Sequence, residues 1–247
     1  MSAFDLSTPV GEIVARYPGT SRIFDRAGVD FCCGGKRSLA EACQAKGLPA
    51  DHLLAELEQE LAAVADEPDT SLAGAPLAAL TRYIVERFHV PLGEELPRLG
   101  RMAERVLEAH AGAHPDVVPE LVCLFRRFRA ELEEHMAKEE SVLFPAIEAL
   151  ATASAATGAR IPPVAALIAA LEGEHDGAGA ALRRLRELTG GFTPPAGACN
   201  TFRALYDGLA HLEKEMHLHV HLENSVLFPR AQARERPAAQ ERRSAIE

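Results

Sequence analysis

One segment of the chain occurs twice, 84 residues apart, and this duplication restricts the fold more than any other feature. Residues 134–145 read EHMAKEESVLFP and residues 218–229 read LHVHLENSVLFP, sharing a histidine, a glutamate and the Ser-Val-Leu-Phe-Pro run. A weaker echo at a spacing of 86 residues pairs His89 with His175 and Leu96 with Leu182. The chain is therefore predicted to contain a doubled helical hairpin.

The hydrophobic periodicity predicts an all-α protein. Apolar residues recur at spacings of three and four, and the alternation typical of strands is nearly absent. Four long periodic stretches are separated by segments rich in glycine and proline, at 76–110, 116–151, 162–189 and 196–232. Because the connections are short, these stretches predict an up-down-up-down four-helix bundle.

The chain is predicted to contain a small module ahead of this bundle. Residues 1–65 hold short helical runs broken by Tyr17-Pro18-Gly19 and Cys33-Gly34-Gly35, and residues 66–76 are rich in linker-type residues. The bundle then covers 77–233. Residues 234–247 lack an apolar face, so we expect a charged tail there.

The composition excludes several classes of function. The 247 residues carry 26 Lys and Arg against 36 Asp and Glu, a formal charge of −10, so a nucleic-acid partner is not expected. Charges interrupt every apolar stretch, which argues against a membrane span. Five cysteines, an odd number, do not form a disulfide framework and favour a reducing compartment. We therefore expect a cytoplasmic protein.

The duplicated segments carry a metal-binding pattern. In each copy a histidine precedes a glutamate by four residues, so both side chains share one helix face. The first and third helices add one histidine each, and six such residues in a bundle suit two metal ions. If each glutamate bridges both ions, each ion has four protein donors, and an oxo or hydroxo bridge adds a fifth. Imidazole and carboxylate together favour iron or manganese, with zinc left open. The predicted ligands are His89, His135, Glu139, His175, His219 and Glu223.

Neighbouring acids and histidines have less certain roles. Glu131 precedes His135 by one turn, Glu215 occupies the matching position before His219, and Glu174 adjoins His175. Each acid could accept a hydrogen bond from an imidazole or line an access path, or it could form a surface salt bridge. His217 and His221 also have a metal-type spacing, but the matching positions 84 residues earlier are Glu133 and Ala137. We therefore expect them on the outer face.

Cys32 and Cys33 are candidate reactive thiols. They are adjacent and precede a Gly-Gly turn, and Lys36 and Arg37 nearby are expected to lower their pKa. A purely structural Cys-Gly turn is the alternative.

Together these motifs resemble the iron–sulfur cluster repair di-iron proteins, the RIC family, which have a hemerythrin-like bundle behind a short N-terminal domain. The resemblance rests on both halves of the chain, and it implies that the six residues named above are the ligands, with Glu139 and Glu223 bridging an oxo-linked iron pair. The motifs are Phe31-Cys32-Cys33-Gly34-Gly35-Lys36, Arg87-Phe88-His89, His135-x-x-x-Glu139, Glu174-His175-Asp176 and His219-x-x-x-Glu223.

The resemblance also implies a stress-response function. Family members restore iron–sulfur proteins after nitrosative or oxidative damage, so the expected partners are damaged iron–sulfur proteins and small diatomics such as nitric oxide and oxygen. Iron donation from the site is one expectation, and a homodimer is left open. Two alternatives remain: an oxygen or nitric oxide sensor or carrier, and an enzyme that reduces nitric oxide at the iron pair.

Overall fold

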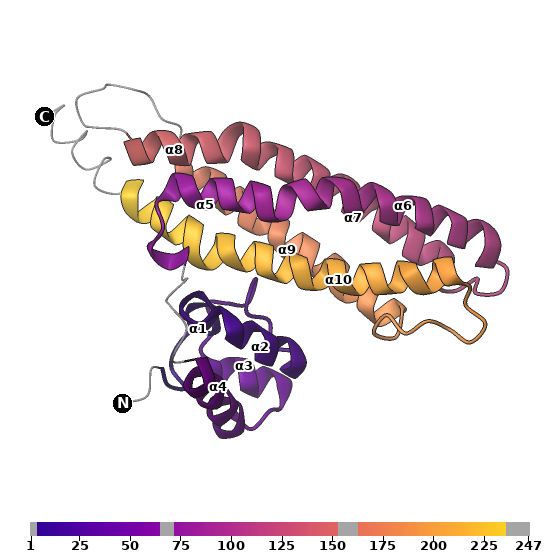
Figure 1. Ribbon diagram of the computed structural model, residues 1–247, viewed down its shortest axis with the longest axis horizontal. Coiled ribbons are helices and arrows are strands. Elements are labelled where there is room, and N and C mark those ends of the chain that lie inside the picture. The colour runs from indigo at the N-terminus through magenta and orange to yellow at the C-terminus, as the bar shows by residue number, and fades with distance from the viewer. Residues whose placement is uncertain (1–3, 65–71, 153–162, 236–247) are drawn as a thin grey trace, which may run out of the picture. The chain divides into compact units, whose positions relative to one another are not determined.

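Helices make up most of the part of the chain that this computed structural model describes (Figure 1). The structure describes residues 4–64, 72–152 and 163–235. Within these ranges there is no β-strand, only an isolated bridge between Pro9 and Ser38. The all-α prediction is therefore confirmed. No helix in the described ranges is long and apolar enough to cross a membrane.

The N-terminal residues form short helices with clear end signals. Ser38 begins one helix with a capping box, in which its side chain accepts from the Glu41 N–H and Glu41 binds the Ser38 N–H. Gly28 and Gly47 end two helices with φ of 65° and 66°, which glycine adopts without strain. The helices are α1 (Val10–Arg16), η1 (Pro18–Thr20), α2 (Ser21–Ala27), α3 (Leu39–Lys46) and α4 (Ala50–Val64).

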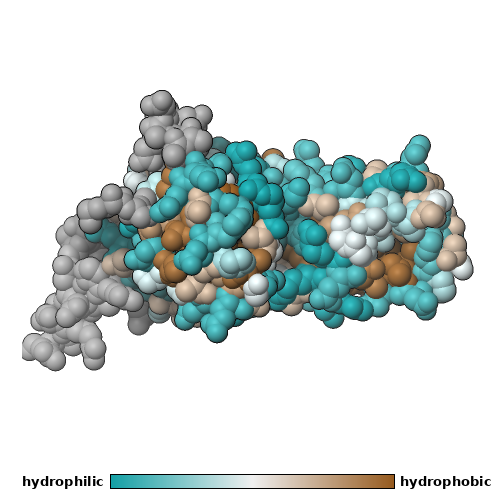
Figure 2. All heavy atoms as spheres, turned by 90° about the horizontal axis from the view of Figure 1, so that it is seen from below, coloured by the Kyte–Doolittle hydropathy of each residue, from teal (hydrophilic) through white to brown (hydrophobic). Residues whose placement is uncertain are grey.

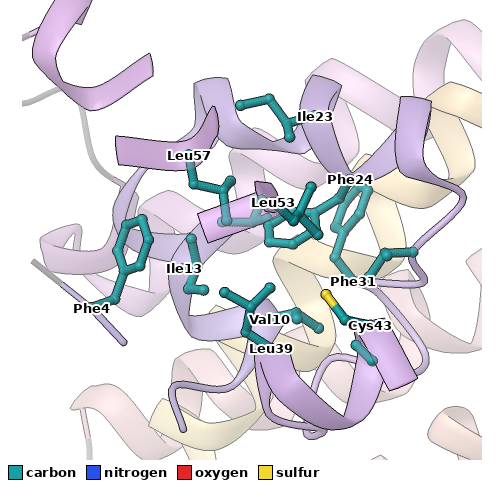
Figure 3. Close-up of a cluster of buried hydrophobic side chains, with 13 residues drawn as sticks. Phe4, Val10, Ile13, Ile23, Phe24, Phe31, Leu39, Cys43, Leu53 and Leu57 are labelled. Carbon is teal, nitrogen blue, oxygen red and sulfur yellow. The ribbon is translucent and has the colours of Figure 1, made fainter. Parts of the chain in front are cut away.

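These short helices bury a core of their own. Figure 3 shows Ile13, Phe24, Leu39 and Leu57 pointing toward one another, and none of them is measurably exposed. Phe31, just before the two cysteines, belongs to the same cluster. Burying one such side chain contributes about 1.5–3 kcal/mol. The core therefore fixes the position of the dicysteine segment.

The four predicted bundle helices are present, close to the predicted bounds. The first is Leu77–His110 and consists of α5 (Leu77–Ile84), η3 (Val85–His89) and α6 (Val90–His110). The second consists of α7 (Val118–Lys138), η4 (Glu139–Leu143) and α8 (Phe144–Thr152). The third is α9 (Val164–Leu188), and the fourth consists of α10 (Asn200–Leu222) and η5 (Glu223–Leu227), with helix continuing to residue 235.

Contacts divide the chain into two compact units. The second unit covers 82–146 and 166–216, and in it parts of all four long helices form a bundle with apolar stripes such as Leu92, Leu96 and Leu99 facing inward. Four ion pairs link neighbouring helices in a closed ring: Arg126 with Glu104, Arg184 with Glu120, Arg186 with Glu213, and Arg87 with Glu215.

The first unit joins the residues up to Thr81 with the segments that begin at Ile147 and His217. The Thr81 hydroxyl donates to Glu148, and Arg230 donates to the Ala75 carbonyl at 2.6 Å. Glu235 accepts from the N–H groups of Val164 and Ala165 and so caps α9.

Two predicted segments lie partly outside the described residues. Of the linker predicted at 66–76, residues 66–71 are outside, and the rest includes the short helix η2 (Leu72–Gly74). Of the charged tail predicted at 234–247, residues 236–247 are outside, and 234–235 continue the last helix. The domain boundaries therefore stay predictions.

Polar side chains dominate the face drawn in Figure 2, with apolar patches between them. Among the described residues, the large hydrophobic side chains that are exposed are Tyr83, Val90 and Val142. The remaining large apolar side chains lie wholly or partly inside.

We predict that Gly35→Ala destabilises the N-terminal helices. A Cβ at Gly35 would lie 2.7 Å from the Phe31 carbonyl oxygen and 3.3 Å from Gly11 Cα, so the backbone must shift. We expect the free energy of unfolding to fall by about 1–3 kcal/mol, measured by chemical denaturation followed by circular dichroism. Gly74→Ala is the control, because a Cβ there meets nothing within 4 Å. Equal stability of the two variants would contradict the close approach.

Candidate metal centre

The six predicted ligands are all buried. None is more than 4% exposed, and both glutamates are fully buried. Burying a carboxylate or an imidazole without a partner lowers the stability of the fold, so the protein must supply opposite charge or hydrogen bonds to such a set. His89 ends η3, His135 lies in the last turn of α7, Glu139 begins η4, His175 lies within α9, His219 is in the last turn of α10, and Glu223 begins η5.

Each of three helices contains one π-helical turn, and each turn begins or ends at a predicted ligand. In each turn the N–H of the next residue binds the carbonyl five residues back. Proline has no N–H and crowds the carbonyl four residues back, so a wider turn accommodates it. Periodicity alone does not reveal these turns, but a proline inside each helical stretch indicates where the regular hydrogen bonding must change. The prolines are Pro91, Pro145 and Pro229, each six residues after the turn begins.

In the second unit, three imidazoles gather beside Glu139. The Nε2 atoms of His89 and His135 each lie 3.4 Å from Glu139 Oε2, and His175 Nε2 lies 3.1 Å from His135 Nε2. Two donors bound to one ion at about 2.1 Å and at right angles are about 3.0 Å apart, so these spacings fit coordination. Both Glu139 oxygens are buried, and Oε2 faces the Nε2 atoms of His89 and His135. A cation would compensate this carboxylate.

In the first unit, the fourth helix presents the second histidine–glutamate pair. His219 Nε2 lies 2.9 Å from Glu223 Oε1, and both side chains are fully buried. The four-residue spacing places both on one face, as in His135 and Glu139. The duplication in the sequence is therefore repeated in local geometry.

Within the second unit, the potential ligand atoms of His135, Glu139 and His175 lie within 4.8 Å of one another. They are two imidazole nitrogens and a carboxylate oxygen, which are donors suited to a metal ion. The structure thus brings His89, His135, Glu139 and His175 together in the second unit, and His219 and Glu223 together in the first.

Two further glutamates contact the Nδ1 atoms of two of these histidines, on the side of each ring opposite Nε2. His89 Nδ1 lies 2.8 Å from Glu140 Oε1, and His135 Nδ1 lies 2.9 Å from Glu174 Oε2. With Nδ1–H donating to a carboxylate, the Nε2 lone pair is left for a metal. Burial tends to raise the pKa of Glu174, but Lys138 and His135 keep it below its usual value, so Glu174 stays ionised.

Glu174 therefore orients His135 on the neighbouring helix. The role of Glu140 was missed from the sequence, because the residue that it contacts lies 51 positions away.

The other two acids have different surroundings. Glu131 forms an exposed ion pair with Arg127 at 3.5 Å, and Glu215 binds Arg87. Both glutamates therefore form a salt bridge, which was one of the roles left open for them by the sequence. Glu131 also lines a cavity of about 320 Å³ that extends to His135 and His175. Other residues that line it include Lys138, Glu174 and Met216. An access path along Glu131 and Glu174 stays a prediction, and this cavity supports it.

Cys32 and Cys33 lie in a compact turn held by Asp30. Asp30 Oδ1 accepts from the backbone N–H groups of Cys32 and Gly34 and from the Cys32 thiol at 3.3 Å. Cys32 is buried and Cys33 is half-buried. The hydrogen bond with Cys33, burial and the Asp30 carboxylate raise the pKa of Cys32 well above its usual value. The expectation of a lowered thiol pKa is wrong for Cys32, since these neighbours outweigh the basic residues.

Within the first unit, His217 and His221 contact the module. The rings of both pack edge-on against Phe31, and His217 Nδ1 lies 3.4 Å from Asp25 Oδ1. Burial lowers the pKa of His221 to about 4, so its imidazole is neutral near pH 7. The prediction of an outer face is wrong for His221, which is buried against the N-terminal helices, a contact that the duplication alone could not show.

Asn224 and Ser225 complete this contact. The Asn224 amide donates to the Cys32 carbonyl at 3.5 Å, and a Cβ at Gly11 would lie 2.6 Å from Ser225 Oγ. The dicysteine turn is therefore bound directly to the residues that follow Glu223.

Comparisons with known proteins agree with this division of the chain. The pattern of the Hemerythrin HHE cation binding domain matches residues 80–231, and that of a Domain of Unknown function (DUF542), ScdA_N, matches residues 6–61. The Iron-sulfur cluster repair protein YtfE of Pectobacterium carotovorum is 40% identical over 225 residues, covering 90% of this chain and 95% of the relative. The protein of that name from Escherichia coli O1:K1 is 38% identical over 228 residues, covering 92% and 97%.

The hemerythrin match covers more than half of the chain, and the relatives match it nearly from end to end. The matched cation-binding domain contains all six predicted ligands. The chain therefore belongs to the family of the YtfE iron-sulfur cluster repair proteins.

Proposed function

We propose that this protein repairs damaged iron–sulfur clusters and that its bundle holds two iron ions. His89 and His219 would bind one ion, His135 and His175 the other, and Glu139 and Glu223 would bridge them. The observations that carry the proposal are the three imidazoles gathered beside the buried Glu139 and the buried His219–Glu223 pair, which has the same four-residue spacing. Relatives named for this repair match along nearly the whole chain.

Iron is one of the two metals that the donor set favours. Imidazole and carboxylate together suit iron or manganese, whereas structural zinc sites are usually rich in thiolate. Two carboxylates and one oxo or hydroxo bridge offset most of the charge of two ferric ions, which reduces the cost of burial.

When bound, an iron pair supplies redox chemistry and coordination positions open to small molecules such as nitric oxide. The protein's own residues prepare that site. Glu140 and Glu174 each hold a proton at Nδ1 of a histidine, which directs the opposite nitrogen inward. Phe144 stacks on His89 at 5.7 Å, and apolar side chains such as Leu132 and Met216 line the cavity beside His135. These groups limit water around the histidines.

The expected clients are iron–sulfur proteins damaged by nitrosative or oxidative stress in the cytoplasm. The cavity lined by Glu131 and Glu174 offers a path for a small molecule or an iron ion to reach His135 and His175. A path of this kind is compatible with iron donation as well as with chemistry at a retained metal.

Replacement of a bridging carboxylate should damage the centre more than replacement of a single histidine. In Glu139→Leu or Glu223→Leu both ions lose a donor and buried positive charge increases, so we expect metal content to fall from about two irons per chain to well below one. His175→Leu should retain about one iron, because only one ion loses a ligand. Metal analysis of anaerobically purified protein measures this.

Glu133→Leu is the matched control, since Glu133 is on the same helix as Glu139 and pairs with Arg129 on the surface. It should retain the full metal content. If Glu139→Leu and Glu223→Leu both keep two irons and an unchanged spectrum, the bridging assignment is wrong.

Glu140 and Glu174, which contact the histidine Nδ1 atoms, should increase the affinity of the site for metal. We expect Glu140→Gln and Glu174→Gln each to weaken iron binding by about 10–100-fold, because the histidine Nδ1–H loses an ionised acceptor. Competition with a chelator measures the affinity. Glu133→Gln is the control, because Glu133 pairs with Arg129 on the surface and is not among the residues that line the cavity. The same loss in all three variants would contradict specific orientation.

The repair function itself is tested with an iron–sulfur dehydratase inactivated by nitric oxide. We expect the iron-loaded chain to restore activity, and we expect metal-free protein and the Glu139→Leu variant to fail. Glu133→Leu should behave as the unsubstituted protein does. Equal repair by metal-free protein would reject the proposal.

Two other results would point to a different function. Reversible gas binding without repair, unchanged by Cys32→Ser and Cys33→Ser, would indicate a sensor or carrier. Multiple turnovers of nitric oxide with an electron donor, again without repair, would indicate a nitric oxide reductase.

A further inference from the structure

The dicysteine turn brings three metal-ligand atoms together outside the bundle centre. Cys32 Sγ lies 3.9 Å from Cys33 Sγ and 3.3 Å from Asp30 Oδ1. A ligand atom from each of the three residues lies within 4.8 Å of the others. Two thiols and a carboxylate in one short turn make a chelating set of their own.

The spacings match tetrahedral coordination. Two sulfurs bound to one ion at about 2.3 Å are about 3.8 Å apart, and a sulfur and an oxygen bound at about 2.0 Å are about 3.5 Å apart. Both distances in the turn agree with these values to about 0.2 Å. The sulfurs would have to move further apart to lie on opposite sides of one ion, as in linear two-thiolate coordination.

We propose that Cys32, Cys33 and Asp30 bind one borderline-soft divalent cation with tetrahedral preference, such as Zn²⁺. Thiolates select such ions, and the harder carboxylate oxygen favours a divalent ion over monovalent copper. On binding, each thiol releases its proton to the solvent, and a water molecule fills the fourth position. The proposal does not depend on iron in the bundle.

The turn is held in shape before any ion binds. Backbone N–H groups of Cys32 and Gly34 fix the Asp30 carboxylate, and Asn224 fixes the Cys32 carbonyl. A Cβ at Gly34 would lie 2.8 Å from the Asp30 carbonyl oxygen, so only glycine allows this close return of the chain. A preorganised ligand set loses less conformational entropy on binding.

Cobalt(II) is the probe, because its complexes with thiolate have a charge-transfer absorption that histidine and glutamate ligands cannot produce. The full-length, reduced, iron-loaded protein is titrated anaerobically with Co²⁺ and followed by difference absorption. We expect the thiolate band to saturate at one Co²⁺ per chain and to disappear when Zn²⁺ is added.

Variants then assign the ligands. Cys32→Ser and Cys33→Ser should each abolish the saturable band, and Asp30→Asn should weaken Co²⁺ binding at least tenfold. Asn keeps an acceptor oxygen for the backbone N–H groups, and circular dichroism checks folding. Cys123→Ser and Cys199→Ser, at exposed cysteines, are controls that should keep the band.

Several outcomes would overturn the proposal. They are the absence of a thiolate band, a band that survives both Cys32→Ser and Cys33→Ser, and a Co²⁺ affinity unchanged by Asp30→Asn.

Discussion

Two carboxylates with no solvent exposure, Glu139 and Glu223, set the main energetic constraint on this structure. An isolated carboxylate inside a protein is strongly destabilising unless charge or hydrogen bonds compensate it. Glu139 Oε2 lies 3.4 Å from the Nε2 atoms of His89 and His135, and Glu223 Oε1 lies 2.9 Å from His219 Nε2. Bound cations would offset the buried negative charge, which is the physical basis of the proposed metal centre.

The helices and residues that repeat along the chain could be predicted from the sequence. Contacts between residues far apart in the sequence could not. The duplicated segments predicted the helical hairpins and six histidines and glutamates that the structure buries, because spacing on a helix determines which face a side chain takes. The partnership of Glu140 with His89 depends on how two helices align, which periodicity does not encode. The π turns were recoverable in part, since Pro145 and Pro229 recur at the same distance from their glutamates.

The two copies have diverged at the positions that face their different neighbours. Glu140 in the second helix orients His89, whereas its counterpart Asn224 binds the carbonyl of Cys32. Likewise Ala137 corresponds to His221, whose ring packs on Phe31. One copy thus supports a histidine and the other holds the dicysteine turn. The polar residues that differ between the two copies therefore each make a contact that the other copy lacks.

The central claim is that the bundle holds two irons per chain. The most direct measurement is the metal content and visible spectrum of anaerobically purified protein, in its reduced and oxidised forms. The account predicts about two irons per chain, with oxo-to-iron charge-transfer bands in the oxidised form. Tightly bound zinc in the bundle, or purified protein that folds fully without metal and does not take up iron, would contradict it.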